Sequence, residues 1–144
     1  MTDEGPKPVS MEELCAGKKV VLFAVPGAFT PTCSVQHLPG FVTNVGSLKD
    51  KGADVVACIS VNDPFVMAAW GKDRNVGEDV LMLSDGNAEF TSAIGLEMDG
   101  SGFGLGTRSQ RYAMIIDDGV VSTLNVENGP ALEVSSAEAI LEVL

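Results

Sequence analysis

The alternation of apolar runs with helical patterns is the feature that most constrains the fold of this chain. Residues 18–25 (KKVVLFAV) and 54–61 (DVVACISV) are almost continuously apolar, as is typical of strands buried on both faces. Between them, over about residues 33–51, apolar side chains recur every three or four positions, which predicts a helix. Pro39 lies inside this pattern and predicts a kink. A strand, a helix and a second buried strand form the unit from which parallel sheets are built.

The second half of the chain continues this alternation and ends differently. A helix capped by Asn62 or Asp63 is expected first, then a short strand, a short helix and a glycine-rich loop. The dipeptide Asp118-Gly119 predicts a tight hairpin, and Ser135 with Glu138 resembles a capping box. We predict a single domain over residues 1–144, an α/β fold in which helices flank a central mixed β-sheet. The remaining expected elements are a helical turn at 11–15, a helix at 64–73, a strand at 80–83, a helix at 88–94, a loop at 99–106, strands at 110–117 and 120–126, and a helix at 136–144.

The charge of the chain excludes several partners. The net charge is −11 over 144 residues, so nucleic acid and anionic membrane surfaces would be repelled. No apolar run reaches the roughly 18–20 residues needed to cross a bilayer. The N-terminus is polar and acidic, unlike a secretory signal, so we expect a cytoplasmic protein. An organellar location is the alternative, if a transit segment has been removed.

Three cysteines and one histidine limit the metal and disulfide chemistry of the chain. Cys15, Cys33 and Cys58 are odd in number and widely spaced, and no CxxC is present, which disfavours a disulfide framework. Zinc would need an unusual Cys3His set that included His37. The loop GSGFGLG does not lie between a first strand and its helix, which disfavours a nucleotide site. We therefore expect neither a metal nor an organic cofactor.

The segment PGAFTPTCS, residues 26–34, carries the strongest chemical signal. It lies where a buried strand ends and a helix begins, the position at which ligands collect in open α/β sheets. Cys33 falls in the first helical turn, where free N–H groups and the helix dipole stabilise an anion such as a thiolate. Thr30 offers a hydroxyl three residues earlier. Without its neighbours, Cys33 would be read equally well as an ordinary buried cysteine.

These residues resemble a known family. PGAFTPTC matches the active-site pattern of peroxiredoxins, and VVLFAVPGAFTPTCS followed by HLPGF is similar to their type II (atypical, Prx5-like) branch. The resemblance continues in residues 55–70, 104–119 and 134–141 and covers about residues 18–144. It implies a thioredoxin-like fold and a thiol-dependent peroxidase. The branch usually has a longer hairpin before the first core strand, where this chain has only about 17 residues.

The resemblance assigns roles to individual side chains. Cys33 would be the peroxidatic cysteine, Thr30 would bind the peroxide, and Pro26 would shield the thiolate. Arg111 matches the catalytic arginine of the branch, and its alternative is a surface salt bridge. Two further side chains are expected to support the site, Arg108 as a charge or structural partner and His37 as a structural hydrogen-bonding group.

The cysteine that resolves the oxidised enzyme is a separate question. In plant-like members the second cysteine lies in the strand that here holds Cys58, which makes Cys58 the resolving candidate. The alternative is that Cys58 is only a core residue. Reduction by glutaredoxin and glutathione, or by thioredoxin, is the other route. Cys15, which we expect in a solvent-exposed loop, is predicted to have no catalytic role.

The expected reaction is the reduction of hydrogen peroxide and alkyl hydroperoxides through a Cys33 sulfenic acid. The alternative is a peroxide sensor or redox relay, in which Cys33 passes its oxidation to a partner protein. The family also forms dimers through the face that bears the active-site loops, so a homodimer is expected. A binding module without chemistry is disfavoured because Pro26, Thr30, Cys33 and Arg111 are all present.

Overall fold

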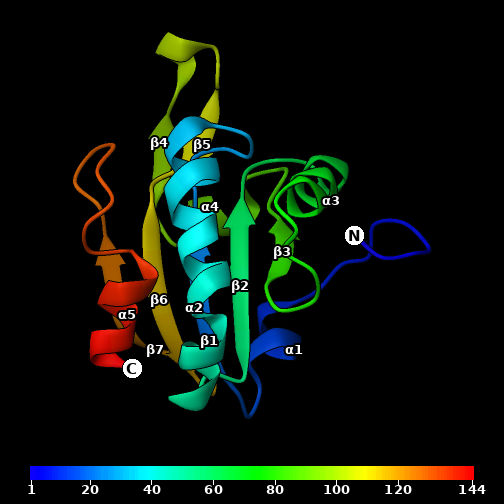
Figure 1. The fold of residues 1–144 in the computed structure, drawn as a ribbon. Coiled ribbons are helices and arrows are strands. Elements are labelled where there is room, and N and C mark those ends of the chain that lie inside the picture. Colours follow the sequence, from blue (N-terminus) through cyan, green and yellow to red (C-terminus); the bar gives the residue numbers. More distant parts are fainter.

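A five-stranded mixed sheet forms the centre of the computed structural model, which describes residues 1–144 (Figure 1). Its strand order is β3-β2-β1-β6-β7. The first three strands along the chain are parallel, and β6 and β7 are antiparallel to their neighbours. This confirms the predicted mixed sheet. The strands are β1 (Lys19–Ala24), β2 (Val55–Ser60), β3 (Leu81–Ser84), β6 (Tyr112–Asp117) and β7 (Val120–Val126).

Helices cover both faces of the sheet, which explains why its central strands are apolar throughout. Side chains along β1 alternate between two clusters: Phe23 belongs to one and Leu22 to the other. The larger cluster packs against α2 (Leu38–Asp50), α3 (Pro64–Asp73) and α5 (Ala137–Val143). The smaller one packs against α1 (Met11–Cys15) and α4 (Glu89–Ala93). None of the helices is long and apolar enough to cross a membrane.

The helix after β1 begins with an irregular turn. Residues Cys33–His37 form a π-helix, η1, in which the N–H of Leu38 donates to the carbonyl of Cys33, and α2 follows directly. Pro39 has no N–H, and its ring would clash with the carbonyl four residues earlier in a regular helix. The π-helical turn thus lies directly before Pro39, while the predicted kink stays a prediction.

The glycine-rich segment forms a small hairpin that the sequence did not predict. Strands β4 (Glu97–Asp99) and β5 (Thr107–Ser109) pair in antiparallel fashion, and a single 3-10 turn, η2 (Ser101–Phe103), lies between them. The hairpin projects from the body of the molecule (Figure 1). Each strand has only three residues, too few for an alternating pattern to be recognised.

Two local predictions near the C-terminus have opposite outcomes. The hairpin turn is confirmed, because Asp118 and Gly119 both have positive φ, 49° and 83°. The capping box at Ser135 is wrong. Ser136 is the N-cap of α5, and its hydroxyl accepts from the N–H of Ala139. The hydroxyl of Ser135 instead donates to Glu127, at 2.6 Å.

Candidate functional site

Cys33 lies at the first position of η1, directly after the loop that leaves β1. Its side chain is 1% exposed. Three hydrogen bonds shape this loop: Ser60 donates to the carbonyl of Val25, Asn62 accepts from the N–H of Ala28, and Thr30 donates to the carbonyl of Gly27. The loop also places Phe29 in a left-handed conformation, with φ 65°. The thiol is therefore held at the carboxyl end of a central strand, inside the protein.

Arg111, which lies 78 positions after Cys33 in the sequence, contacts the Cys33 sulfur. It immediately precedes β6, and its Nη2 donates to Sγ of Cys33 at 3.1 Å. The guanidinium is 6% exposed, yet it has no carboxylate partner; the ion pair of the chain joins Arg74 and Asp73. Its Nε is buried without a hydrogen-bond partner. A buried cation needs a counter-charge, and an anionic Cys33 sulfur is the contacting group that can provide one.

His37 accepts the second donor of the same guanidinium. Nη1 of Arg111 donates to Nδ1 of His37 at 2.8 Å, and Nε2 of His37 donates to the carbonyl of Ser135 at 2.9 Å. Burial, and then the charge of Arg111, lowers the pKa of His37 to about 4. The ring is therefore neutral near pH 7, and its Nδ1 lone pair fixes one edge of the arginine. This geometry matches the structural hydrogen bonding expected of His37.

Thr30 and Pro26 belong to this loop and Arg108 lies beside it, and none of the three has a side-chain hydrogen bond to Cys33. Because Thr30 donates its hydroxyl proton to Gly27 at 2.6 Å, the oxygen has lone pairs left to accept. A side chain at Gly27 would meet Thr30 at 3.1 Å and Arg108 Nη1 at 3.3 Å. Arg108 also donates to the carbonyl of Leu105, a bond within the β4–β5 hairpin. Pro26 follows the carboxyl end of β1 in the same loop.

The other two cysteines are buried and free. Cys58 is 0% exposed, in the middle of β2, between Phe23 of β1 and Met82 of β3. It shares a core cluster with Cys33, but the two are not joined. Cys15 ends α1 and is packed in the smaller cluster, so the expectation of an exposed loop is wrong. Burial raises the pKa of both thiols, well above the ordinary value for Cys58.

The sequence did not indicate the residues that make hydrogen bonds to the neighbours of Cys33 and His37. The indole N–H of Trp70 donates to the hydroxyl of Ser34 at 2.9 Å, beside Cys33. The carboxylate of Glu127 accepts from Ser135, whose carbonyl holds His37. The Trp70–Ser34 and His37–Ser135 contacts join residues 36 and 98 positions apart, so no local pattern could reveal them.

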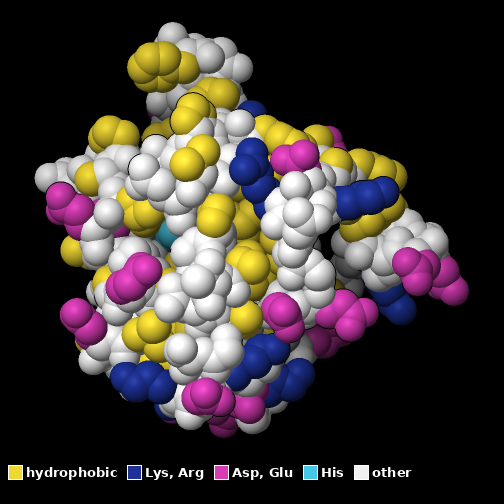
Figure 2. Space-filling view, viewed as in Figure 1, with side chains coloured by type: hydrophobic (Ala, Val, Ile, Leu, Met, Phe, Trp, Pro, Cys, Tyr) yellow, Lys and Arg dark blue, Asp and Glu magenta, His cyan; other side chains and the backbone are white.

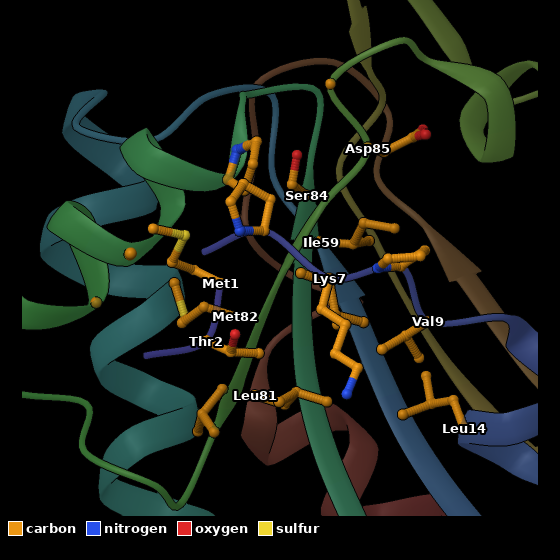
Figure 3. Close-up of a pocket in the computed structure, with 18 of the residues that line it drawn as sticks. Met1, Thr2, Lys7, Val9, Leu14, Ile59, Leu81, Met82, Ser84 and Asp85 are labelled. Atoms are coloured by element: carbon orange, nitrogen blue, oxygen red, sulfur yellow. The ribbon is translucent and has the colours of Figure 1, made fainter. Parts of the chain in front are cut away.

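A cavity of about 1220 Å³ lies elsewhere on the molecule (Figure 3). It opens between the N-terminal segment, with Lys7 and Val9, and the β3 residues Leu81 and Met82. Cys33, Arg111 and His37 do not line it. No group of three or more His, Cys, Asp or Glu side chains is placed to hold a metal ion.

Comparisons with known proteins agree with this geometry. The sequence model of the Redoxin family matches residues 1–141. Peroxiredoxin-2E, chloroplastic, of Arabidopsis thaliana is 58% identical over 140 residues, 96% of this chain and 60% of that protein. Peroxiredoxin-2D of the same plant is 53% identical over 94% of this chain and 84% of its own length. The chain thus spans about 60% of the length of the chloroplastic relative.

A solved structure gives the same result. Reduced Prx3 from Vibrio vulnificus, in complex with hydrogen peroxide, superposes with a TM-score of 0.95 at 62% identity. The match covers 99% of this chain and 89% of that one. The thioredoxin-like arrangement expected from the resemblance is thereby confirmed. The chain belongs to the redoxin family and, within it, to the type II peroxiredoxins.

Proposed function

We propose that this protein is a thiol-dependent peroxidase that reduces hydrogen peroxide and alkyl hydroperoxides with Cys33. The observation that carries the proposal is the 3.1 Å bond from Arg111 to the Cys33 sulfur, made by a buried guanidinium that has no carboxylate partner. Such a cation stabilises the thiolate, which is the nucleophilic form of cysteine. Membership of the peroxiredoxins supports the same activity.

The reaction follows from these groups. The Cys33 thiolate attacks the terminal peroxide oxygen, a new S–O bond forms, and the O–O bond breaks. Negative charge develops on the leaving oxygen, which takes a proton and departs as water or an alcohol. Cys33 is left as a sulfenic acid, two electrons more oxidised, and a thiol must then reduce it.

Two groups are available to orient the peroxide. The Nε of Arg111 is a buried donor without a partner, suited to an oxygen that gains charge in the transition state. The oxygen of Thr30 is free to accept from the peroxide O–H, since its own proton is bound to Gly27. Held by a donor on one side and an acceptor on the other, the O–O bond can be aligned with the sulfur. Pro26 is proposed to limit the access of water.

The single tryptophan offers a direct test. Trp70 is bound to Ser34, next to Cys33, so its fluorescence should change when Cys33 is oxidised. We expect a rapid change on mixing with hydrogen peroxide in stopped flow, absent in Cys33→Ser. Repeated turnover with a small thiol donor indicates a peroxidase, whereas one oxidation followed by a lasting complex with a partner protein indicates the relay. A rate no faster than that of free cysteine contradicts both.

The role of Cys58 as the resolving thiol is kept as part of the proposal. Cys58 and Cys33 share one core cluster, but Cys58 is a central strand residue, so a disulfide requires local unfolding around it. After one equivalent of peroxide, mass spectrometry should find a loss of two hydrogens in the wild type and a sulfenic acid in Cys58→Ser. If both proteins instead stop at sulfenic acid or a glutathione adduct, an external thiol resolves the enzyme.

The reductant and the location are proposed from the family alone. We propose glutaredoxin with glutathione, or thioredoxin, as the reductant, to be distinguished by comparing turnover with each purified system. A cytoplasmic location is retained, with an organelle as the alternative that fractionation would detect. Two of the relatives are named chloroplastic.

A homodimer is proposed from the exposed apolar side chains on the elements around Cys33. Phe29, Val35 and Phe65 are more than half exposed, and Phe103 at the tip of the hairpin is 88% exposed. Figure 2 shows hydrophobic side chains on the projecting hairpin and the part of the body beside it. Sedimentation should give about twice the 15.0 kDa chain mass, falling toward the monomer in Phe103→Ser with Phe65→Ser. A monomeric wild type at micromolar concentration contradicts this proposal.

A further inference from the structure

Glu127 makes hydrogen bonds to two segments near the Cys33 site, the one that holds Arg111 and the one that holds Ser135. It directly follows β7, and only 6% of it is exposed. Its backbone N–H donates to the carbonyl of Arg111 at 2.9 Å. Its carboxylate oxygen Oε2 accepts from the N–H of Glu133 at 2.9 Å, and from the N–H and hydroxyl of Ser135 at 2.7 and 2.6 Å. Glu127 therefore fixes Arg111 and Ser135 relative to each other.

From Ser135 the hydrogen bonds continue to the sulfur without a gap. The carbonyl of Ser135 accepts from Nε2 of His37, which leaves Nδ1 of that ring as an acceptor. Nδ1 accepts Nη1 of Arg111, and Nη2 of the same guanidinium donates to Cys33. The Ser135 carbonyl and the Arg111 donor thus both favour the Nε2–H tautomer of His37. The tautomer in turn decides whether Arg111 has an acceptor on the side away from the sulfur.

Hydrogen bonds as well as packing hold the segment that carries Ser135. A cavity of about 290 Å³ lies beside this segment, lined by Gln36, His37, Gly40, Leu132 and Ser136 among others. Apart from the Glu127 bonds, the segment is held by the bond from His37 to the carbonyl of Ser135 and by an exposed contact from Asn125 to the carbonyl of Val134 at 3.0 Å. Burial raises the pKa of Glu127, but the hydrogen bonds from Ser135, Glu133 and Val134 outweigh it and hold the pKa below its usual range. The carboxylate is therefore charged near pH 7, which strengthens its bonds to Ser135.

We infer that Glu127 is a positioning residue for Arg111: it holds the Ser135 carbonyl so that His37 stays in the Nε2–H tautomer and directs the guanidinium to Cys33. Glu127 touches neither the sulfur nor the proposed peroxide position. Its effect on rate rests on the proposed peroxidase function, whereas its effect on His37 does not.

The only histidine of the chain makes the tautomer measurable without ambiguity. In 15N-labelled wild type at pH 7, the imidazole spectrum should show a single neutral Nε2–H form. Glu127→Ala should give averaged or doubled ring-nitrogen signals, because Nε2–H loses its fixed acceptor, and Glu127→Gln should lie between the two. The matched control is Glu133→Gln, which removes the same charge from an exposed side chain of the same segment. A wild-type imidazole spectrum in folded Glu127→Ala overturns the inference.

Kinetics give the second readout. A misplacement of about 1 Å can cost about 10²-fold in rate, so Glu127→Ala should lower the rate constant for Cys33 oxidation by about 10-fold to 10²-fold. Glu127→Gln should recover part of the rate, and Glu133→Gln should match the wild type. The rates are compared on protein shown by near-UV circular dichroism to be folded. An unchanged rate in a variant with an altered tautomer overturns the positioning role, while a wild type without peroxidase activity overturns only the proposed function.

Discussion

Cys33 and Cys58 are equally hidden from solvent, yet their surroundings have opposite chemistry. Both are at most 1% exposed and belong to one core cluster. Cys58 lies between Phe23 and Met82 in a fully paired strand, and burial raises its pKa well above the ordinary value. Cys33 begins a helix and accepts a hydrogen bond from Arg111.

The difference teaches that burial alone does not prepare a thiol for reaction. A buried thiol without a donor stays protonated, since desolvation disfavours the charged form. The same degree of burial favours the thiolate once a cation is fixed beside the sulfur, because the attraction between the two charges is stronger away from water. What separates the two cysteines is Arg111 and the residues that orient it.

The largest difference in the rate of peroxide consumption should appear when Cys33 and Cys58 are replaced in separate variants. Cys33→Ser removes the nucleophile and should slow peroxide consumption by at least about 10³-fold. Cys58→Ala should leave the oxidation of Cys33 within about twofold, because Arg111 donates its hydrogen bond to Cys33 and none to Cys58. Stopped-flow fluorescence of Trp70 measures both. Comparable losses of rate in the two variants would show that the two thiols do not differ in this way.

Removing the Arg111 cation should leave the Cys33 sulfur, like that of Cys58, without a charged donor beside it. Arg111→Gln withdraws the donors that face the sulfur and the leaving oxygen, and a loss of about 10²–10³-fold is expected. Arg74→Gln, on an exposed arginine, is the control and should match the wild type. The rate constant is read from the peroxide dependence of Cys33 oxidation. If Arg111→Gln keeps more than a tenth of the rate, another group stabilises the thiolate.

The Cys33 side of the core should also respond to pH through His37. Its pKa is lowered from 6.5 to about 4, so between these values the unfolded chain binds a proton that the folded protein does not. The free energy of unfolding should therefore fall as the pH falls through this window, by up to about 3 kcal/mol. Urea unfolding at several pH values measures this. His37→Gln cannot bind the proton and should show a much flatter profile between pH 6.5 and pH 4.5.

The smallest effect is expected from a neighbour of Cys33 that is not proposed to touch the substrate. Ser34→Ala leaves the indole N–H of Trp70 buried without an acceptor, which should lower the free energy of unfolding by about 1–2 kcal/mol. Ser47→Ala, at an exposed position of α2, should change it by less than about 0.5 kcal/mol. Thermal or urea unfolding compares the two. Equal stabilities would show that the Trp70 bond contributes nothing to this region.

The sequence predicted those parts of the molecule that local patterns encode. The apolar runs of β1 and β2, the cap at Asp63 and the Asp118-Gly119 turn each follow from a few neighbouring residues. The approach of Arg111 to Cys33 was expected only through family resemblance, because 78 positions separate them. The role of Ser135 was mistaken, since its partner Glu127 lies outside the helix that it was expected to cap.

In the proposed peroxidase, the π-helix at Cys33 has a consequence for the lifetime of the oxidised form. Because the sulfur is almost inaccessible, a protein reductant can reach it only after this turn opens. Pro31 and Pro39 flank the turn, and neither can donate a backbone hydrogen bond to hold it closed. Slower opening gives a second peroxide more time to convert the sulfenic acid to a sulfinic acid, which ordinary thiols do not restore. Under the proposed function, the local stability of this helical turn should therefore influence the peroxide dose at which Cys33 is over-oxidised.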